Sequence, residues 1–440
     1  MNQEQFLQRR SKLRTCLSEG DALLLPCYPS HARNSDNMFP YRQESSLYYL
    51  TGFEEAESMA LFRPGKVPEF ILFVPPRDAV AELWDGVRFG VEGAKKHFGA
   101  DEAHSFYELE EFLPKYLNES SKLFYQMHLN PELDSIILNI LEGVRKSKGR
   151  TGLGLLPLYD STEVMGDIRV IKSSEEIDLM RRSGKIAAEA QKEAMRFIRP
   201  GLTEKQVQGV LSYMFLKENA GDYAYPPIVA TGSNATVLHY KDNNQECKDG
   251  DLLLIDAGCE YDYYASDITR TFPVNGKFTA AQKDLYQAVL NAQKATIDII
   301  KPGITFVEVQ DKAIEVISQH LKDLELFDQS VSEIIDKKLY RKYYPHNIGH
   351  WLGLDVHDRG RYMIEGQTRP LEAGMVLTIE PGIYVPKDDM DAPEYFRGTG
   401  VRIEDDILVT DNGFENLTKD VPSEISEIES LMEEKSFLNI

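Results

Sequence analysis

The sequence contains little cysteine and no long apolar run. Its four cysteines, Cys16, Cys27, Cys247 and Cys259, are scattered among 440 residues without a CxxC pair or a cysteine-histidine zinc spacing. So few thiols argue against a disulfide scaffold and favour a reduced, cytoplasmic chain. No stretch approaches 18 apolar residues, so we expect no segment that spans a membrane. The polar, amphipathic N-terminus also lacks the apolar stretch of a signal peptide.

Positive charge is also scarce. The chain has 49 lysines and arginines against 71 aspartates and glutamates, which gives a net charge of −22. This excess of negative charge disfavours nucleic acids and anionic membrane surfaces as partners. A length of 440 residues exceeds what one hydrophobic core usually covers, so we expect two domains.

The pattern of apolar residues places the domain boundary near Arg169. From residue 1 to about 170, strand-like runs (ALLL, SLYYLTGF, MALFR, FILFVPP) alternate with helical runs (AVAELWDGV, LEEFLPKYL, LDSIILNILEGVRKS). Ser173 and Glu176 then have the form of a capping box that opens a long amphipathic helix. The sequence therefore predicts a smaller α/β domain over 1–170 and a second domain over 171–440.

The second domain contains two internal echoes. IRPGLTEKQVQ (198–208) matches IKPGITFVEVQ (300–310), and in each copy a threonine precedes a glutamine or glutamate by three residues, as in a helix cap. GDLLLIDAG (250–258) aligns with GMVLTIEPG (374–382), which places Glu380 at the position of Asp256. Two matches in the same order predict a duplicated α+β unit with pseudo-twofold symmetry, in which these two acids approach one another.

A carboxylate closes the apolar run LLLID, where an unpaired charge is costly. If the following segment forms a hairpin that turns at Tyr261 and Asp262, then Asp256 faces Asp267. Directly opposed residues have Cβ atoms about 4.5–5.5 Å apart, and like charges there destabilise a sheet unless a cation lies between them. The hairpin therefore predicts a cation site.

Further candidate ligands follow along the chain. Glu380 ends the second echo strand, and Glu404 lies in GVRIEDDILVT, where alternation places it on one face with Arg402 and Asp406. PHNIGHWLGLDVHDRG holds three histidines, and its glycines favour a loop or an irregular strand over a helix. Oxygen-rich ligation with one imidazole suits Mn²⁺ and similar divalent ions, and bridging carboxylates imply two such ions.

This constellation resembles the pita-bread metallopeptidases, most closely the aminopeptidase P (Xaa-Pro aminopeptidase) family. The five ligands of that family match Asp256, Asp267, His350, Glu380 and Glu404, and none is missing. The similarity extends to RNSDNMFPYRQESSLYYLTGF (33–53) and ELWDGVRFG (82–90), and so covers nearly the whole chain. It implies an α+β protein whose C-terminal pita-bread (creatinase/aminopeptidase) fold follows a smaller α/β domain.

The resemblance also implies an activity: hydrolysis of the bond between an N-terminal residue and a following proline by a hydroxide bridging two divalent ions, taken here as Mn²⁺. Glu380 would shuttle the proton to the leaving nitrogen. His357 would contact the scissile carbonyl and His239 the carbonyl of the proline, with His346 just behind the ligands. The residues that match the substrate pocket are Tyr225, Tyr362, Tyr384 and Arg402.

The N-terminal domain carries no chemistry that its sequence reveals. In the family this domain restricts access to the site and builds the oligomer. The resemblance therefore implies a homodimer or homotetramer, in which Asp36, Trp84 and Arg88 would reach a neighbouring subunit's site.

Several alternatives stay open at this point. A prolidase, which cleaves Xaa-Pro dipeptides, would carry the same metals and histidines, whereas the extra N-terminal domain disfavours methionine aminopeptidase. A creatinase-type hydrolase would have lost several ligands, and none is lost. A non-catalytic peptide-binding protein on the same scaffold is the remaining alternative.

Overall fold

The computed structural model describes residues 3–152 and 154–438. The chain divides into two compact units, Met1–Ile168 and Arg169–Ile440, which are described separately. In the part of the chain that is described, no helix is both long and apolar enough to cross a bilayer.

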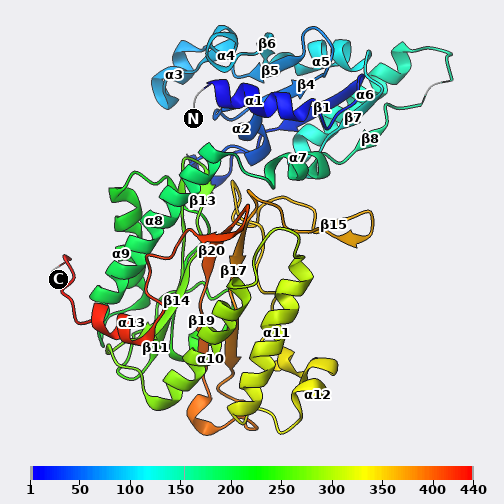
Figure 1. Ribbon diagram of the computed structural model, residues 1–440. Helices are drawn as coiled ribbons and strands as arrows, with labels where there is room; N and C mark the ends of the chain where they lie inside the picture. The colour runs from blue at the N-terminus through cyan, green and yellow to red at the C-terminus, as the bar shows by residue number, and fades with distance from the viewer. Residues whose placement is uncertain (1–2, 153, 439–440) are drawn as a thin grey trace. The chain divides into compact units, whose positions relative to one another are not determined.

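The N-terminal unit is built on one six-stranded mixed sheet with the order β6-β5-β4-β1-β7-β8 (Figure 1). The strands are β1 (Asp21–Pro26), β4 (Met59–Phe62), β5 (Phe70–Val74), β6 (Glu102–Ser105), β7 (Lys122–Phe124) and β8 (Leu158–Tyr159), with a separate hairpin of β2 (Ala32–Asn34) and β3 (Asn37–Met38). The helices are α1 (Gln3–Leu13), α2 (Ser45–Thr51), α3 (Ala79–Asp85), α4 (Gly90–Phe98), α5 (Leu109–Leu117), α6 (Pro131–Ser147) and α7 (Thr162–Arg169).

One predicted strand of this unit is wrong: SLYYLTGF forms helix α2. The side chain of Glu44 caps the helix by accepting a hydrogen bond from the backbone N–H of Leu47. Gly52 ends it in the left-handed conformation, with φ of 70°. These two local caps outweigh the preference of tyrosine and threonine for a strand, which depends on packing more than on the backbone.

The C-terminal unit surrounds short sheets with long helices. The helices are α8 (Ser174–Phe197), α9 (Glu204–Lys217), α10 (Ala280–Ile297), α11 (Phe306–Asp323), α12 (Val331–Asp336) and α13 (Ile425–Leu431). The sheets have the orders β10-β11-β14, β13-β12-β9, β17-β20-β21, β18-β19 and β15-β16. Figure 1 shows α8 and α9 along one side of the strands and α11 along the other.

The strands of this unit are mostly short and buried. Their bounds are β9 (Asp222–Tyr223), β10 (Ile228–Thr231), β11 (Leu252–Asp256), β12 (Cys259–Tyr261), β13 (Tyr264–Ala265), β14 (Thr269–Pro273), β15 (Met363–Ile364), β16 (Gln367–Thr368), β17 (Val376–Ile379), β18 (Gly382–Val385), β19 (Thr399–Arg402), β20 (Asp405–Thr410) and β21 (Gly413–Asn416). Ser173 and Glu176 form the predicted capping box at the start of α8.

The predicted duplication recurs in the hydrogen bonds. The backbone N–H of Gly201 donates to Cys247 O at 2.9 Å, and that of Gly303 donates to Leu371 O at 2.9 Å. A threonine caps α9 in the first copy and α11 in the second, each through a capping box. In the first copy the buried strand β11 ends at Asp256, and β14 begins just after Asp267. In the second copy Glu380 follows the buried strand β17, and β20 begins just after Glu404. The α+β organisation with an internal repeat is therefore confirmed.

The hairpin that carries the first two acids has a different register from the predicted one. Asp256 faces Thr269, not Asp267, and Tyr261 faces Tyr264. The turn residues are Asp262 and Tyr263, both with positive φ (51° and 73°), as a two-residue type I′ turn requires. Because the shift is two residues, each side chain keeps its face, and the two carboxylates become diagonal neighbours.

Candidate metal centre and catalytic cavity

A cavity of about 240 Å³ in the C-terminal unit gathers most of the predicted site residues. Eight of them line it: Tyr225, His239, Asp256, Asp267, His350, His357, Glu380 and Glu404. Its other lining residues, which the sequence analysis missed, are Pro226, Ile228, Tyr240, Lys241 and Val356. Tyr240 and Lys241 directly follow His239 and Val356 precedes His357, so adjacency to the histidines was the available signal.

Strand ends position the four acids. Asp256 closes β11 and Glu380 follows β17, while Asp267 lies just before β14 and Glu404 just before β20. Asp256, Asp267 and Glu404 are buried, with 8%, 5% and 2% of their surface exposed. Ordered backbone on both sides of each acid leaves its carboxylate little freedom to move away from the others.

The backbone of His350 is aligned along β17. Its N–H donates to Thr378 Oγ1 at 3.0 Å, and its carbonyl accepts from the Thr378 N–H at 2.9 Å. Gly349 makes this close approach possible, because a Cβ there would lie 1.9 Å from the Thr378 carbonyl oxygen. The segment is irregular and not helical, as predicted.

The imidazole of His350 is oriented for a cation. Its Nδ1 lies 3.0 Å from the Trp351 carbonyl oxygen, which can only accept, so Nδ1 carries the proton. Nε2 then points toward Asp267 Oδ2 at 3.4 Å and Glu380 Oε1 at 3.7 Å. Two carboxylates this close to one ring nitrogen favour a positive charge at this position. Asp267, His350 and Glu404 each offer one ligand atom, all within 4.8 Å of one another. The donor set therefore fits a divalent metal ion.

The acids also raise one another's pKa. Burial and the neighbouring Asp256 raise the pKa of Asp267 well above its usual range, and burial and Asp267 do the same for Glu404. Burial, together with the carboxylate of Glu404, raises the pKa of Glu380 to about 8. Such a cluster is stable only when it binds protons or cations.

Behind Asp256 runs a chain of hydrogen bonds that ends at a fourth histidine, His346. Arg402 donates from Nη2 to Asp256 Oδ2 at 2.5 Å and from Nη1 to the Tyr384 phenol oxygen at 2.9 Å. That phenol lies 2.9 Å from His346 Nε2, and His346 Nδ1 lies 2.7 Å from the Asn347 carbonyl oxygen. Burial lowers the pKa of His346 to about 4, which keeps its imidazole neutral. Arg402, Tyr384 and His346 do not line the cavity described above.

The two remaining tyrosines of the prediction differ in position. The Tyr225 hydroxyl lies 2.6 Å from Asp256 Oδ1 and also hydrogen-bonds Asp267. Tyr362 accepts a hydrogen bond from the Trp351 N–H at 3.0 Å and stacks on the Trp351 ring, with ring centroids 5.1 Å apart. Tyr225 therefore faces the acids, whereas Tyr362 holds the backbone next to His350.

Two further side chains support the acids from behind, and the sequence analysis assigned them no such contact. Thr269 donates from Oγ1 to Glu404 Oε2 at 2.6 Å, and Asp406 accepts from the Asp267 N–H at 3.1 Å. Arg270 pairs with Asp405 on the opposite side of the strand, at 2.8 Å. These contacts join residues more than 130 positions apart, so no sequence window contains them.

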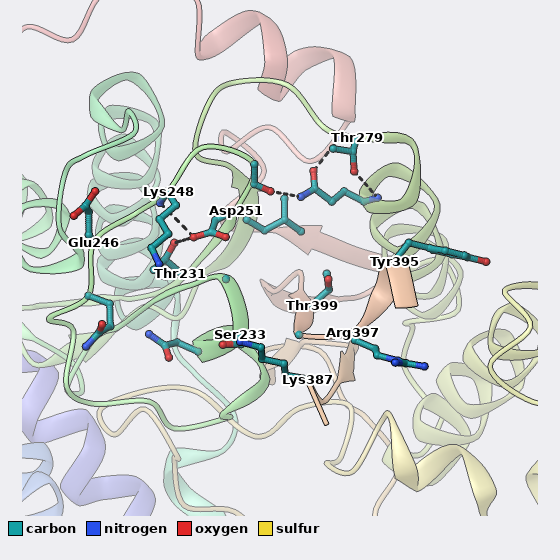
Figure 2. A pocket seen from close by; sticks show the side chains of 17 residues that line it. Thr231, Ser233, Glu246, Lys248, Asp251, Thr279, Lys387, Tyr395, Arg397 and Thr399 are labelled. Carbon is teal, nitrogen blue, oxygen red and sulfur yellow. Dashed lines mark hydrogen bonds between the residues drawn. The ribbon is translucent and has the colours of Figure 1, made fainter. Parts of the chain in front are cut away.

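A larger hollow of about 770 Å³ lies at the opposite ends of the same strands and contains none of the predicted residues (Figure 2). Thr231, which lines it, pairs with Leu253, whereas Ile228 at the other end of β10 pairs with Asp256. Its polar groups bond to one another: Asp251 accepts from Thr231 and from the Lys248 backbone, as the dashed lines in Figure 2 show. Size alone therefore does not mark the reactive site in this unit.

Comparison with known proteins agrees with this geometry. Residues 178–411 match the model of metallopeptidase family M24, and residues 6–125 match that of the aminopeptidase P N-terminal domain. Xaa-Pro aminopeptidases of Haemophilus influenzae and Escherichia coli are 40% and 39% identical, each over 98% of this chain and 97% or 98% of the relative. The solved structure of Pseudomonas aeruginosa aminopeptidase PepP is 41% identical, covers 98% of both chains and has a TM-score of 0.94.

These full-length similarities confirm the predicted pita-bread fold preceded by a smaller domain. The family model covers more than half of the chain. The cluster of acids and histidine that could hold a metal ion agrees with it. The chain belongs to metallopeptidase family M24, with an N-terminal domain of the aminopeptidase P type.

Proposed function

We propose that this chain is an Xaa-Pro aminopeptidase, which hydrolyses the bond between an N-terminal residue and a following proline. The observation that carries the proposal is the orientation of His350, whose Nε2 faces Asp267 and Glu380 inside a cavity of four carboxylates. The relatives named Xaa-Pro aminopeptidase support the choice of substrate, since they align with both units of the chain.

The proposed metal ligands are Asp256, Asp267, His350, Glu380 and Glu404, which would hold two divalent ions. Oxygen-rich ligation with a single imidazole favours Mn²⁺. When bound, a divalent ion polarises the scissile carbonyl and lowers the pKa of the attacking water. The protein's own contribution is to hold four carboxylates close together at the ends of strands, where the ordered backbone keeps them from moving apart.

Glu380 is the proposed proton carrier. It is only partly exposed, and its Oε1 lies 3.7 Å from His350 Nε2, which places its carboxylate at the candidate metal site. In this role it removes the proton of the attacking water and delivers it to the leaving proline nitrogen. A carboxylate held beside the attacking water is placed to perform both steps.

His357 and His239 are proposed to donate hydrogen bonds to the substrate. Both line the cavity, and the His357 ring lies 4.3 Å from that of His350. Burial and the neighbouring imidazole lower the pKa of His357, so its ring is neutral and has one N–H to donate. We assign this N–H to the scissile carbonyl oxygen, where negative charge develops, and His239 to the carbonyl of the proline.

Of the four predicted pocket residues, one contacts the substrate directly in this proposal and three act through other residues. Tyr225 contacts the substrate at the cavity wall, next to Asp256 and Asp267. Tyr384 and Arg402 act through Asp256, to which Arg402 donates, and His346 holds the Tyr384 phenol. Tyr362 acts through the backbone beside His350.

The N-terminal unit, residues 1–170 in our prediction, is proposed to restrict access and to form a homodimer or homotetramer. Three apolar side chains of α3 support an interface: Val80, Leu83 and Trp84 are 71%, 81% and 81% exposed. Apolar side chains this exposed and this close together indicate a protein contact. All four cysteines are free thiols, which supports the cytoplasm as the compartment.

A substrate comparison tests the function. The protein is stripped with EDTA, and turnover of an Xaa-Pro-Xaa tripeptide, an Xaa-Pro dipeptide and an Xaa-Ala-Xaa tripeptide is measured with and without added Mn²⁺. We expect Mn²⁺-dependent release of the first residue from the proline tripeptide and none from the alanine tripeptide. Activity on the dipeptide alone would mean a prolidase, and binding without turnover would mean a non-catalytic protein.

A further inference from the structure

The loop that carries His357 has no helix or strand to hold it. Residues 352–362 are irregular, yet His357 must keep its imidazole beside His350 if it is to act on a substrate. What surrounds His357 is a set of charges: Asp355 lies two residues before it and Asp358 directly follows it. Both acids pair with a cation from the segment that precedes α8.

Arg169 binds both acids. Its Nη2 lies 2.8 Å from Asp355 Oδ2 and also donates to Asp358 Oδ1. Lys172 completes the cluster, with Nζ 3.0 Å from Asp358 Oδ2. Two cations therefore meet two acids, and the side chains of Arg169, Lys172 and Asp358 are each only 1% exposed.

The backbone around this cluster is tied down as well. The Asp358 N–H donates to the Trp351 carbonyl at 2.9 Å, next to His350, and the Lys172 N–H donates to the Gly374 carbonyl at 2.8 Å. Gly353 leaves room for the Asp358 carboxylate, because a Cβ there would lie 2.1 Å from Asp358 Oδ2.

A buried ion pair is a poor source of stability, since the cost of taking the charges out of water offsets their attraction. Its directional hydrogen bonds, however, select one geometry. Here the hydrogen bonds fix Asp355 and Asp358, which lie on either side of His357. The contacts therefore favour a role in positioning His357 over a role in stabilising the fold.

We propose that Arg169, Lys172 and Asp358 form a positioning cluster that sets the place of the His357 imidazole in the catalytic cavity. The proposal rests on the proposed function, because it assigns the cluster's effect to peptide hydrolysis. None of the three residues is a metal ligand or lines the cavity. We therefore expect their removal to change the chemical step without changing metal binding.

Asp358→Asn tests this, because it keeps the shape of the side chain and removes its charge. We expect kcat on an Xaa-Pro-Xaa tripeptide to fall about a hundredfold, the size of effect that a misplacement of about 1 Å produces. KM and the affinity for Mn²⁺ by calorimetry should stay within about twofold of those of the parent chain. The matched control is Glu193→Gln, another buried carboxylate, which contacts Ser436 and Phe437 and should leave kcat unchanged.

Amide hydrogen exchange over residues 351–362 gives a readout that does not require activity. We expect exchange to accelerate at least tenfold in Asp358→Asn and to be unchanged in Glu193→Gln. If the parent chain hydrolyses no Xaa-Pro peptide, the proposed function fails while the exchange result still tests the cluster. If Asp358→Asn fails to fold, Arg169→Lys takes its place. That change keeps the positive charge but removes the guanidinium that binds both acids. Unchanged kcat or unchanged loop exchange in a folded variant would overturn the proposal, as would a matching loss of Mn²⁺ affinity.

Discussion

Arg402 donates a hydrogen bond to Asp256 across 146 residues of sequence, and both groups are buried. Three more carboxylates lie near this pair, so Arg402 supplies positive charge that the acids need most when no metal ion is bound.

Arg402→Met should lower the melting temperature far more in EDTA than in saturating Mn²⁺. Breaking a buried ion pair costs about 3–5 kcal/mol when nothing replaces the lost charge, and bound cations would replace it. Differential scanning calorimetry under both conditions measures the difference. Arg181→Met is the control, since Arg181 pairs with Glu415 at the surface and contributes at most about 1 kcal/mol. Equal losses in EDTA and Mn²⁺ would contradict the prediction.

Asp267→Ala should reduce kcat/KM by at least about a thousandfold. A metal ion contributes several kcal/mol to the transition state, and about 1.4 kcal/mol corresponds to a factor of ten. Metal analysis of the purified variant should show at least one Mn²⁺ fewer per chain. In EDTA the variant should be no less stable than the parent, because the change removes a repelling carboxylate. Asp249→Ala, which alters an exposed acid, serves as the control; activity that survives Asp267→Ala would exclude this metal centre.

In EDTA, the chain should lose stability as pH rises from about 5 to 8. The pKa of Glu380 is raised from an ordinary 4.5 to about 8 by burial and Glu404. In that window the unfolded chain has released the proton that the folded chain still binds, so the unfolded state holds fewer protons and stability falls with pH. We expect the melting temperature to drop by roughly 5–10 °C.

Added Mn²⁺ should reverse this trend, since metal binding displaces those protons and strengthens as pH rises. Thermal melts at pH 5, 6.5 and 8 measure both effects. Glu380→Gln, which cannot titrate, should flatten the slope in EDTA. A metal-free melting temperature that climbs with pH would contradict the prediction.

Gly258→Ala should prevent the hairpin of β12 and β13 from closing. A Cβ at this position would lie 1.6 Å from the Ser266 carbonyl oxygen, and this backbone has nowhere to move. We expect a loss of about 3 kcal/mol or more, together with weaker Mn²⁺ binding, because Asp256 and Asp267 flank the hairpin. Chemical denaturation and calorimetry measure the two losses. At Gly413 an added Cβ meets nothing within 4 Å, so Gly413→Ala should be nearly neutral.

Trp84→Glu should dissociate the proposed oligomer. The side chain is 81% exposed on α3, and a charge in an apolar interface costs several kcal/mol unless it is paired. Light scattering after gel filtration should show a smaller mass for this variant than for the parent. Leu138→Glu, which changes a partly exposed leucine on α6, should keep the parent mass. A monomeric parent chain, or an unchanged mass in Trp84→Glu, would remove α3 from the interface.

Much of the site could be predicted because the residue types that bind metal ions can be recognised in the sequence. Acids that end apolar runs, and a histidine flanked by glycines, are visible in one sequence, and the second echo pairs Asp256 with Glu380. The supporting contacts were not visible. Thr269 bonds to Glu404 and Asp406 accepts from Asp267, and such pairs form only when distant strands pack.

The sequence by itself determined the helix caps, the duplicated unit and the ligand types, since each depends on residues a few positions apart or on a repeated pattern. The tertiary structure decided the rest. It set the hairpin register that opposes Asp256 to Thr269, because the left-handed turn at Asp262 and Tyr263 is a choice of backbone conformation that the apolar pattern leaves open. It also chose Asp256 as the partner of Arg402, since a guanidinium can reach several acids and only packing selects one of them.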